Sequence, residues 1–450
     1  MSAQAAAIPA GGYNKGKLFL LSVVALTTSG MVFSIRTNIL EALQKTFFDQ
    51  LDPFHAAQMV GAVAGVAFLG FAISVFLSSP LCDYLGMGRL LGLASLLHIG
   101  GTLVIVFAQP LSERFVAFWV LWFGMLVVGL AHGLVEAVIN PLVATLYPDD
   151  KTHKLNVLHV WWPGGLIIGG LIGYIMGKFG LSWQLKQATI LIPSLIYLVM
   201  IIGTKFPPTE RKAAGVSGKE MWGQALRPMF IVLWLSMFLT AASELGAGQW
   251  VDAALTRTIG FQGILLLVYV SGLMFVMRHF AGPLAHKLSP IGLLWLSCLL
   301  ASLGLVSLSY ANTPILGILG ATVWGVGVCY MWPTMLAVNS ERFPKGGAVL
   351  MGLMGTAGNL SVYVVMPLMG RVIDAYKIKA LPAGVKWDEL MVQVANKVPG
   401  AKAIMDKALA YASPYAFRYL AALPAVLILV FGIFWLRDRA RGGYKVEKLG

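Results

Sequence analysis

Glu136 stands in an otherwise apolar stretch, GLVEAVINPLVATLYP, which reads as a membrane helix. An ionised side chain at the centre of such a helix costs at least ~2.5–3.5 kcal/mol, so its presence needs a compensating function or partner. A buried carboxyl favours its neutral form, and Glu136 could therefore exchange a proton during a reaction cycle. The alternative is a permanently ionised glutamate that pairs with Arg36, or with a group on another helix, and locks the bundle.

Arg36 lies in a second apolar run, FSIRTN. Its guanidinium offers a planar fork of five donors that suits a carboxylate or a phosphate better than a neutral sugar. Three interpretations stay open: anion binding, an internal ion pair with Glu136, or a position at a helix end.

The segment SELGAGQW supplies a second membrane carboxylate, Glu244, together with Gln249 and Trp250. The glycines between the two polar residues favour a kinked or unwound helix, which would let both face the same cavity. We expect Glu244 to take part in proton coupling, and Gln249 and Trp250 to contact a substrate.

Aromatic and amide side chains of the remaining helices are typical of a sugar site. His159 and Trp162 could stack on a pyranose ring while their nitrogens bond a hydroxyl, although tryptophan is also common at membrane interfaces. Asn359 and Tyr363 are one helical turn apart and would form another wall of the site; packing is the alternative.

The composition determines which elements hold these residues. Hydrophobic residues make up 58% of the 450 and charged residues only 12%, about half the usual charged share of soluble domains. We therefore predict an all-α integral membrane protein with twelve transmembrane helices. Their approximate cores are 18–40, 58–80, 89–109, 115–146, 155–177, 186–206, 228–254, 261–285, 291–310, 314–337, 347–372 and 414–436.

The formal net charge of +14 follows mainly from basic residues at the termini and in loops. Their placement favours cytoplasmic termini and some attraction to anionic lipids, and it argues against a nucleic-acid partner. We expect a monomer in the cell membrane, the inner membrane if the source is a bacterium. No phosphate-binding loop, HExxH or CxxC motif is present, so we expect no enzyme activity, no cofactor and no metal site.

Short segments recur about 200 residues apart. SPLCDYLG follows the second predicted helix, GPLAHKLS follows the eighth, and YIMGKFG has a counterpart in PLMGRVID. The repeats predict two pseudo-symmetric six-helix halves, 1–206 and 228–450, joined by a cytoplasmic linker, 207–227, with a substrate site between the halves. The outer segment 377–413 has apolar residues at helical spacing and is expected to include an amphipathic helix.

The stretch SPLCDYLGMGR resembles the loop between the second and third helices of the major facilitator superfamily. The resemblance implies that Asp83, Gly86 and Arg89 form a cytoplasmic latch between the two halves; a plain turn at a helix end is the alternative. We also assign Arg278, in the eighth helix, to a structural or gating pair.

Within that superfamily, five motifs in order resemble the proton symporters of fucose, galactose and glucose. They include EAVINPLVATLYP, SELGAGQW and MWPTMLAV. The resemblance implies that Glu136 takes part in proton coupling. It places Asn38 where the fucose permease has an aspartate of the first helix, and an amide cannot carry a proton. We keep Asn38 as a substrate-binding residue, and Glu136 and Glu244 are then the carboxylates left for coupling.

The sequence thus predicts a secondary active transporter that moves a small polar solute, a sugar, together with protons by alternating access. The alternatives are an organic-anion or phosphate-ester carrier that uses Arg36, an exporter of amphipathic compounds, and a membrane receptor or scaffold that does not transport.

Overall fold

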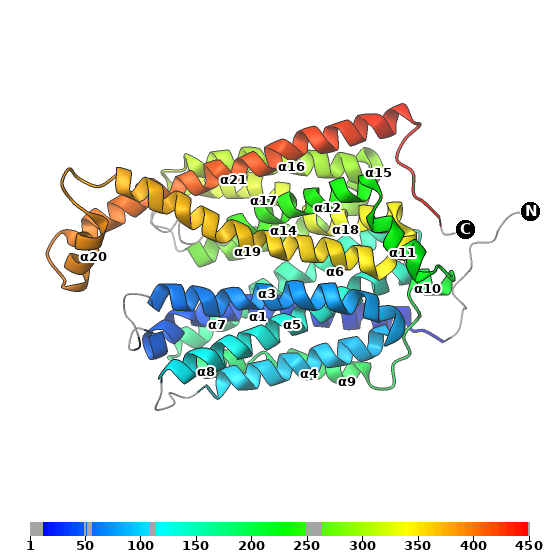
Figure 1. The fold of residues 1–450 in the computed structure, drawn as a ribbon, viewed down its shortest axis with the longest axis horizontal. Helices are drawn as coiled ribbons and strands as arrows, with labels where there is room; N and C mark the ends of the chain where they lie inside the picture. Colours follow the sequence, from blue (N-terminus) through cyan, green and yellow to red (C-terminus); the bar gives the residue numbers. More distant parts are fainter. Residues whose placement is uncertain (1–11, 49–50, 52–55, 109–113, 249–262, 449–450) are drawn as a thin grey trace, which may run out of the picture.

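The computed structural model describes residues 12–48, 51, 56–108, 114–248 and 263–448, and nearly all of them are helical (Figure 1). The first group of helices comprises α1 (Lys15–Leu43), η1 (Gln44–Phe48), α3 (Ala56–Tyr84), α4 (Met87–Val106), α5 (Arg114–Leu146), α6 (Lys151–His159), α7 (Trp161–Lys178), α8 (Trp183–Ala188) and α9 (Leu191–Ile201). Two short helices follow, α10 (Glu210–Ala213) and α11 (Gly218–Ala225). The last group comprises α12 (Pro228–Ala241), η2 (Ala242–Gly246), α14 (Gly263–Arg278), α15 (Ala281–Leu288), α16 (Pro290–Ser309), α17 (Pro314–Val328), α18 (Met331–Arg342), η3 (Pro344–Gly346), α19 (Gly347–Lys379), α20 (Trp387–Ala395) and α21 (Ala401–Ala440).

Eleven segments of the described chain are long and apolar enough to cross a membrane. Each overlaps one of the spans expected from the sequence, and the eighth expected span, 261–285, contains the shorter apolar helix Val268–Arg278. The all-helical membrane architecture is confirmed, while the count of twelve stays a prediction.

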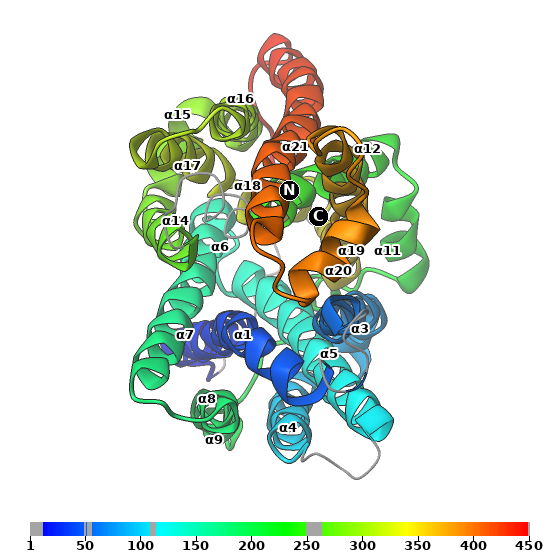
Figure 2. The ribbon, with the colours of Figure 1, turned by 90° about the vertical axis from the view of Figure 1, so that its left-hand side faces the viewer.

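The helices gather in two groups with the site between them. In Figure 2, α1 and α3–α9 lie together below, and α12–α21 lie together above. The groups meet where α3 packs against α19 and where α7 packs against α14. In Figure 1, α10 and α11 lie at the end of the bundle where α1 begins and α21 ends, that is, where the described chain has both its termini.

Glycine lets the helices around the site approach closely. A Cβ at Gly165 of α7 would collide with backbone atoms of Thr27 and Gly30 of α1, and a Cβ at Gly133 of α5 would collide with the backbone of Phe71 in α3. In a lipid bilayer the hydrophobic effect does not drive helices together. Small residues let them approach closely enough for van der Waals packing to do so. The glycines therefore allow α1 to lie close to α7, and α3 close to α5.

Two prolines interrupt helices beside the site. Because a proline has no N–H, the carbonyl four residues earlier loses its helical donor. Pro163 frees the carbonyl of His159 in this way, where α6 gives way to α7, and Pro333 frees that of Cys329, where α17 gives way to α18. Two backbone acceptors are thus available to side chains from other helices.

The outer segment 377–413 contains the helix α20, at the end of the bundle opposite the termini (Figure 1). Leu390 is fully buried there, whereas Met391 is exposed. A helix is therefore present in this segment, while its amphipathic character and its position outside the membrane stay predictions.

Candidate functional site

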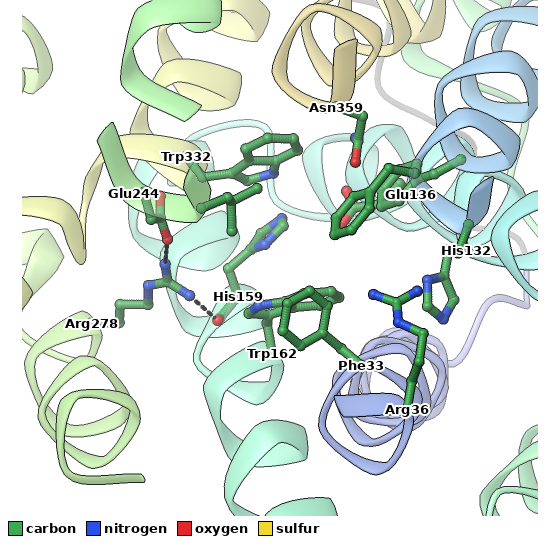
Figure 3. Close-up of a pocket in the computed structure, with 14 residues that line it drawn as sticks. Phe33, Arg36, His132, Glu136, His159, Trp162, Glu244, Arg278, Trp332 and Asn359 are labelled. Carbon is green, nitrogen blue, oxygen red and sulfur yellow. Dashed lines mark hydrogen bonds and ion pairs between the residues drawn. The ribbon is translucent and has the colours of Figure 1, made fainter. Parts of the chain in front are cut away.

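A cavity of about 550 Å³, counting the space at its mouth, lies between the two groups of helices (Figure 3). The residues that line it are Phe33 and Arg36 of α1; Ala67, Phe68 and Phe71 of α3; His132 and Glu136 of α5; His159 of α6; Trp162 of α7; Glu244 and Leu245 of η2; Arg278 of α14; Trp332 of α18; and Asn359 of α19. Aromatic walls with a few polar groups are the usual composition of small-molecule sites.

One side of the cavity holds an ion pair between Arg278 and Glu244, with 3.1 Å between the Nη2 and Oε1 atoms. Arg278 also donates from Nε to the carbonyl of Cys329 and from Nη1 to the carbonyl of His159, both at 2.5 Å. These carbonyls are the two that Pro163 and Pro333 release. Arg278 therefore ties three elements of the second helix group to the backbone of the first group.

Glu244 sits in the π-helical turn η2, close to the kink that the glycines of SELGAGQW predicted. A π turn rotates the residues after it relative to an α-helix and is frequent at functional sites. The second carboxylate oxygen of Glu244, Oε2, is buried and has no hydrogen-bond partner within the described part of the chain.

The other side of the cavity holds Glu136, whose carboxylate has an amide partner. Asn140 donates from Nδ2 to Oε2 of Glu136 at 2.6 Å, and its Oδ1 lies 2.9 Å from Nε2 of His159. Since an amide oxygen only accepts, Nε2 of His159 is the donor in that bond. The asparagine of the Asn-Pro motif thus joins the candidate proton carrier to a candidate substrate ligand.

Arg36 lies on the same side of the cavity as Glu136 and His132 (Figure 3). Its guanidinium carbon is 5.1 Å from the ring centroids of both Phe33 and Phe68, so two rings flank the charge. Arg36 and Glu136 are both described, and no ion pair joins them. The internal ion pair that the sequence left open is therefore not formed in this structure.

The structure brings most of the predicted binding residues to this cavity. Trp162 and His159 line it, as does Asn359, whose amide points inward (Figure 3). Tyr363, one turn further along α19, is 51% exposed and does not line it. Gln249 and Trp250 lie outside the described residues.

Asn38 also lies apart from the cavity. Its Oδ1 accepts a bond of 3.0 Å from Nζ of Lys186, and its side chain packs against Gly173 of α7. Its assignment to substrate binding has no support from this position and stays a prediction.

The predicted latch residues lie at the end of the bundle that holds the termini. Asp83, at the end of α3, accepts bonds from Thr209 and from Arg211 in the segment between the two helix groups. Gly86 has φ of 86°, a conformation that favours glycine, and α4 begins after it. Arg89 is exposed. Asp83 thus holds the connecting segment, and its gating role stays a prediction.

Sequence reasoning missed several cavity residues, notably His132, Phe33, Phe68 and Trp332. His132 precedes Glu136 by one helical turn, and that spacing was a usable signal. The aromatic residues gave none, because an aromatic side chain in an apolar helix looks the same whether it faces lipid or a cavity.

Sequence reasoning also missed hydrogen bonds that join the two helix groups near the end of the bundle where α1 begins and α21 ends. Thr152 of α6 donates to Glu341 of α18 at 2.6 Å, and Asn156 donates to Thr334 at 3.3 Å. Within the second helix group, Tyr444 donates to the other oxygen of Glu341 at 2.7 Å. The bonds of Thr152 and Asn156 thus join the two helix groups between the cavity and that end.

Comparison with known proteins gives a family match over most of the chain. The family model described as the Major Facilitator Superfamily matches residues 18–367. The D-xylose transporter of Levilactobacillus brevis is 22% identical over 341 residues, which cover 64% of this chain and 70% of that protein. The monosaccharide-sensing protein 2 of Arabidopsis thaliana is 26% identical over 148 residues, which are 32% of this chain and only 19% of that longer protein.

Solved structures share the fold. The proton:xylose symporter XylE bound to 6-bromo-6-deoxy-D-glucose superposes with a TM-score of 0.73 at 14% identity, covering 94% of this chain and 96% of that one. The human organic anion transporter MFSD10 superposes with a TM-score of 0.68, also at 14% identity, covering 93% of this chain and all of that one. At such identities the likeness concerns the fold alone.

Proposed function

Because this chain belongs to the major facilitator superfamily, a family of multi-pass membrane transporters, we propose that it carries a sugar together with protons by alternating access. The observation that carries the proposal is the cavity, which combines aromatic walls with two buried carboxylates, Glu136 and Glu244, on opposite sides. The names of the similar proteins, a D-xylose transporter and a proton:xylose symporter, support a sugar as the solute.

The cavity offers the groups that a sugar needs. Indole rings of Trp162 and Trp332 can stack on the apolar face of a pyranose, and the Asn359 amide and the His159 imidazole can bond its hydroxyls. We assign substrate binding to these residues, to Arg36 and Glu136, and to the predicted residues Gln249 and Trp250.

The two carboxylates receive different roles. Glu136 has an amide partner and, within the described part of the chain, forms no ion pair with an arginine, so it can gain and lose a proton without breaking one. Glu244 is held by Arg278, and its protonation would loosen the contact of that arginine with the first helix group. We assign the transported proton to Glu136 and a gating step to Glu244 and Arg278.

Alternating access would require the halves 1–206 and 228–450 to rock about the cavity, with 207–227 as the linker. The bonds Thr152–Glu341 and Asn156–Thr334 close the end that holds the termini, and they would have to break when that end opens. With both termini cytoplasmic in a cell membrane, the structure would then be closed toward the cytoplasm. The proposed unit is a monomer.

Uptake into proteoliposomes tests the proposal. Purified protein is reconstituted, an inside-alkaline pH gradient is imposed, and accumulation of a panel of labelled monosaccharides, neutral and acidic, is followed. We expect saturable accumulation of at least one sugar, abolished by a protonophore. Transport of amphipathic compounds alone would favour an exporter, and binding of a sugar without flux would favour a receptor; either result would overturn the proposal.

A further inference from the structure

Arg36 is the arginine of the cavity for which the described residues offer no counter-charge. Its side chain is only 4% exposed, and within the described residues no carboxylate lies at ion-pair distance from it. A charge this deep in a membrane bundle is costly and usually marks an ion or substrate pathway. Phe33 and Phe68 offset part of that cost through cation–π contacts, but a ring face accepts no bond from the guanidinium fork in its plane, and no described residue does so either.

The four charged side chains of the cavity are two of each sign, and two of them form an ion pair. Arg278 and Glu244 neutralise each other at 3.1 Å. Arg36 and Glu136 carry opposite charges without contact, and the other titratable groups that line the cavity are His132 and His159. Once Glu136 takes up a proton, the cavity keeps one uncompensated positive charge, on Arg36.

We propose that the transported sugar bears one carboxylate, that Arg36 binds this carboxylate, and that Glu136 takes up one proton in the same step. This inference rests on the proposed function and narrows its substrate class to sugar acids. The anion replaces Glu136 as the counter-charge of Arg36, and Glu136 becomes neutral, so the loaded cavity has the same net charge as the empty one. One anion and one proton then cross together without net charge movement.

The same charge balance disfavours a phosphate ester. A phosphate monoester carries about −1.5 to −2 charges at pH 7 and would need a second free cation. The other arginine of the cavity is already neutralised by Glu244 and fixed by two backbone carbonyls. A carboxylate matches the single planar fork that remains, which can bind it through two parallel bonds.

Sugars that differ only at C6 provide a direct test. Proteoliposomes receive D-glucose, D-glucuronate or glucose 6-phosphate, and the galactose and mannose series in parallel, under an inside-alkaline pH gradient. We expect a uronate to accumulate at least tenfold above its neutral and phosphorylated counterparts. Equal or better accumulation of a neutral sugar would overturn this inference and leave the proposed function standing.

The driving force gives a second readout on the same vesicles. A membrane potential set with potassium and valinomycin should leave uronate accumulation unchanged, whereas the pH gradient should drive it. A response to the potential would contradict electroneutral coupling. If no sugar accumulates at all, the proposed function fails, and a thermal-shift measurement of uronate binding then decides whether the carboxylate site exists.

Variants of Arg36 locate the carboxylate. Arg36→Gln should raise the Kd for the uronate at least tenfold, and Arg36→Lys should raise it less, because lysine keeps the charge and loses the fork. Arg437→Gln, at an exposed arginine near the end of α21, is the matched control and should bind as the unmodified protein does. Unchanged uronate affinity in Arg36→Gln would overturn the assignment. If Arg36→Gln does not fold, Arg36→Lys and the selectivity of the unmodified protein decide the question.

Discussion

Glu136 and Glu244 face the same cavity and are almost equally buried, with 7% and 6% of their surface exposed, yet their surroundings differ in kind. Glu244 is paired with an arginine that is itself held by two backbone carbonyls. Among the described residues, the side chain that bonds the Glu136 carboxylate is the amide of Asn140. Burial alone therefore does not determine what a membrane carboxylate can do. An arginine partner holds the carboxylate in its ionised form, whereas an amide partner leaves it free to take up a proton.

On the side of the cavity that holds Arg278 and Glu244, backbone carbonyls fix the position of the arginine. Pro163 and Pro333 stand in different helix groups, and each frees a carbonyl that Arg278 then bonds. On the other side of the cavity, the described contacts of Arg36 and Glu136 are with side chains: Arg36 is flanked by rings, and the Glu136 carboxylate accepts from the amide of Asn140. A transporter needs both, a contact that holds the halves together and a site whose charge can change.

The largest effect should come from Arg278→Met. It leaves Glu244 buried without a counter-charge and two carbonyls without donors, and breaking a buried pair on one side typically costs ~3–5 kcal/mol. We expect a clear fall in the thermal midpoint of the detergent-solubilised protein. The double variant Arg278→Met with Glu244→Gln is the control and should recover part of the loss. An unchanged thermal midpoint in Arg278→Met would contradict the claim that the ion pair of Arg278 and Glu244 holds its side of the cavity together.

Asn140→Ala should have a smaller effect, on the side of the cavity that holds Glu136. It removes the donor to Glu136 and the acceptor of His159, and a buried polar group left without a partner costs ~1–3 kcal/mol. We expect a modest loss of stability together with a shifted pH profile of uptake. An unaltered pH profile would mean that Asn140 does not tune Glu136.

Pro163→Ala should change stability least, by under ~1 kcal/mol. Alanine restores an N–H that competes with Arg278 for the carbonyl of His159, so one bond replaces another. We expect nearly unchanged melting but slower uptake, measured as the initial rate in proteoliposomes. An uptake rate equal to that of the unmodified protein would show that this contact plays no part in gating.

Much of the fold could be predicted from the sequence, because a membrane helix needs about 20 apolar residues and such runs are easily seen. Of the eighth expected span, 261–285, the structure describes residues 263–285, which hold α14 and the beginning of α15. The kink near Glu244 was predicted from glycines, and the structure has a π turn there.

The site was predicted less completely. Polar residues such as Arg36, Glu136 and Asn359 stand out in apolar helices, and they do line the cavity. Which of them pair could not be predicted, because the pairing of Arg278 depends on carbonyls contributed by distant helices. Asn38 was chosen by resemblance to another protein, and here it contacts Lys186 instead.

Proton-driven accumulation in the glutamine variants tests the central claim most directly. Glu136→Gln keeps the size of the side chain and an oxygen that can accept from Asn140, so the protein should fold and still exchange substrate across the membrane in counterflow. It should no longer accumulate substrate against its gradient when a pH gradient is imposed, because Gln cannot take up the proton. Accumulation by Glu136→Gln equal to that of the unmodified protein would contradict the assignment of the coupling proton to Glu136.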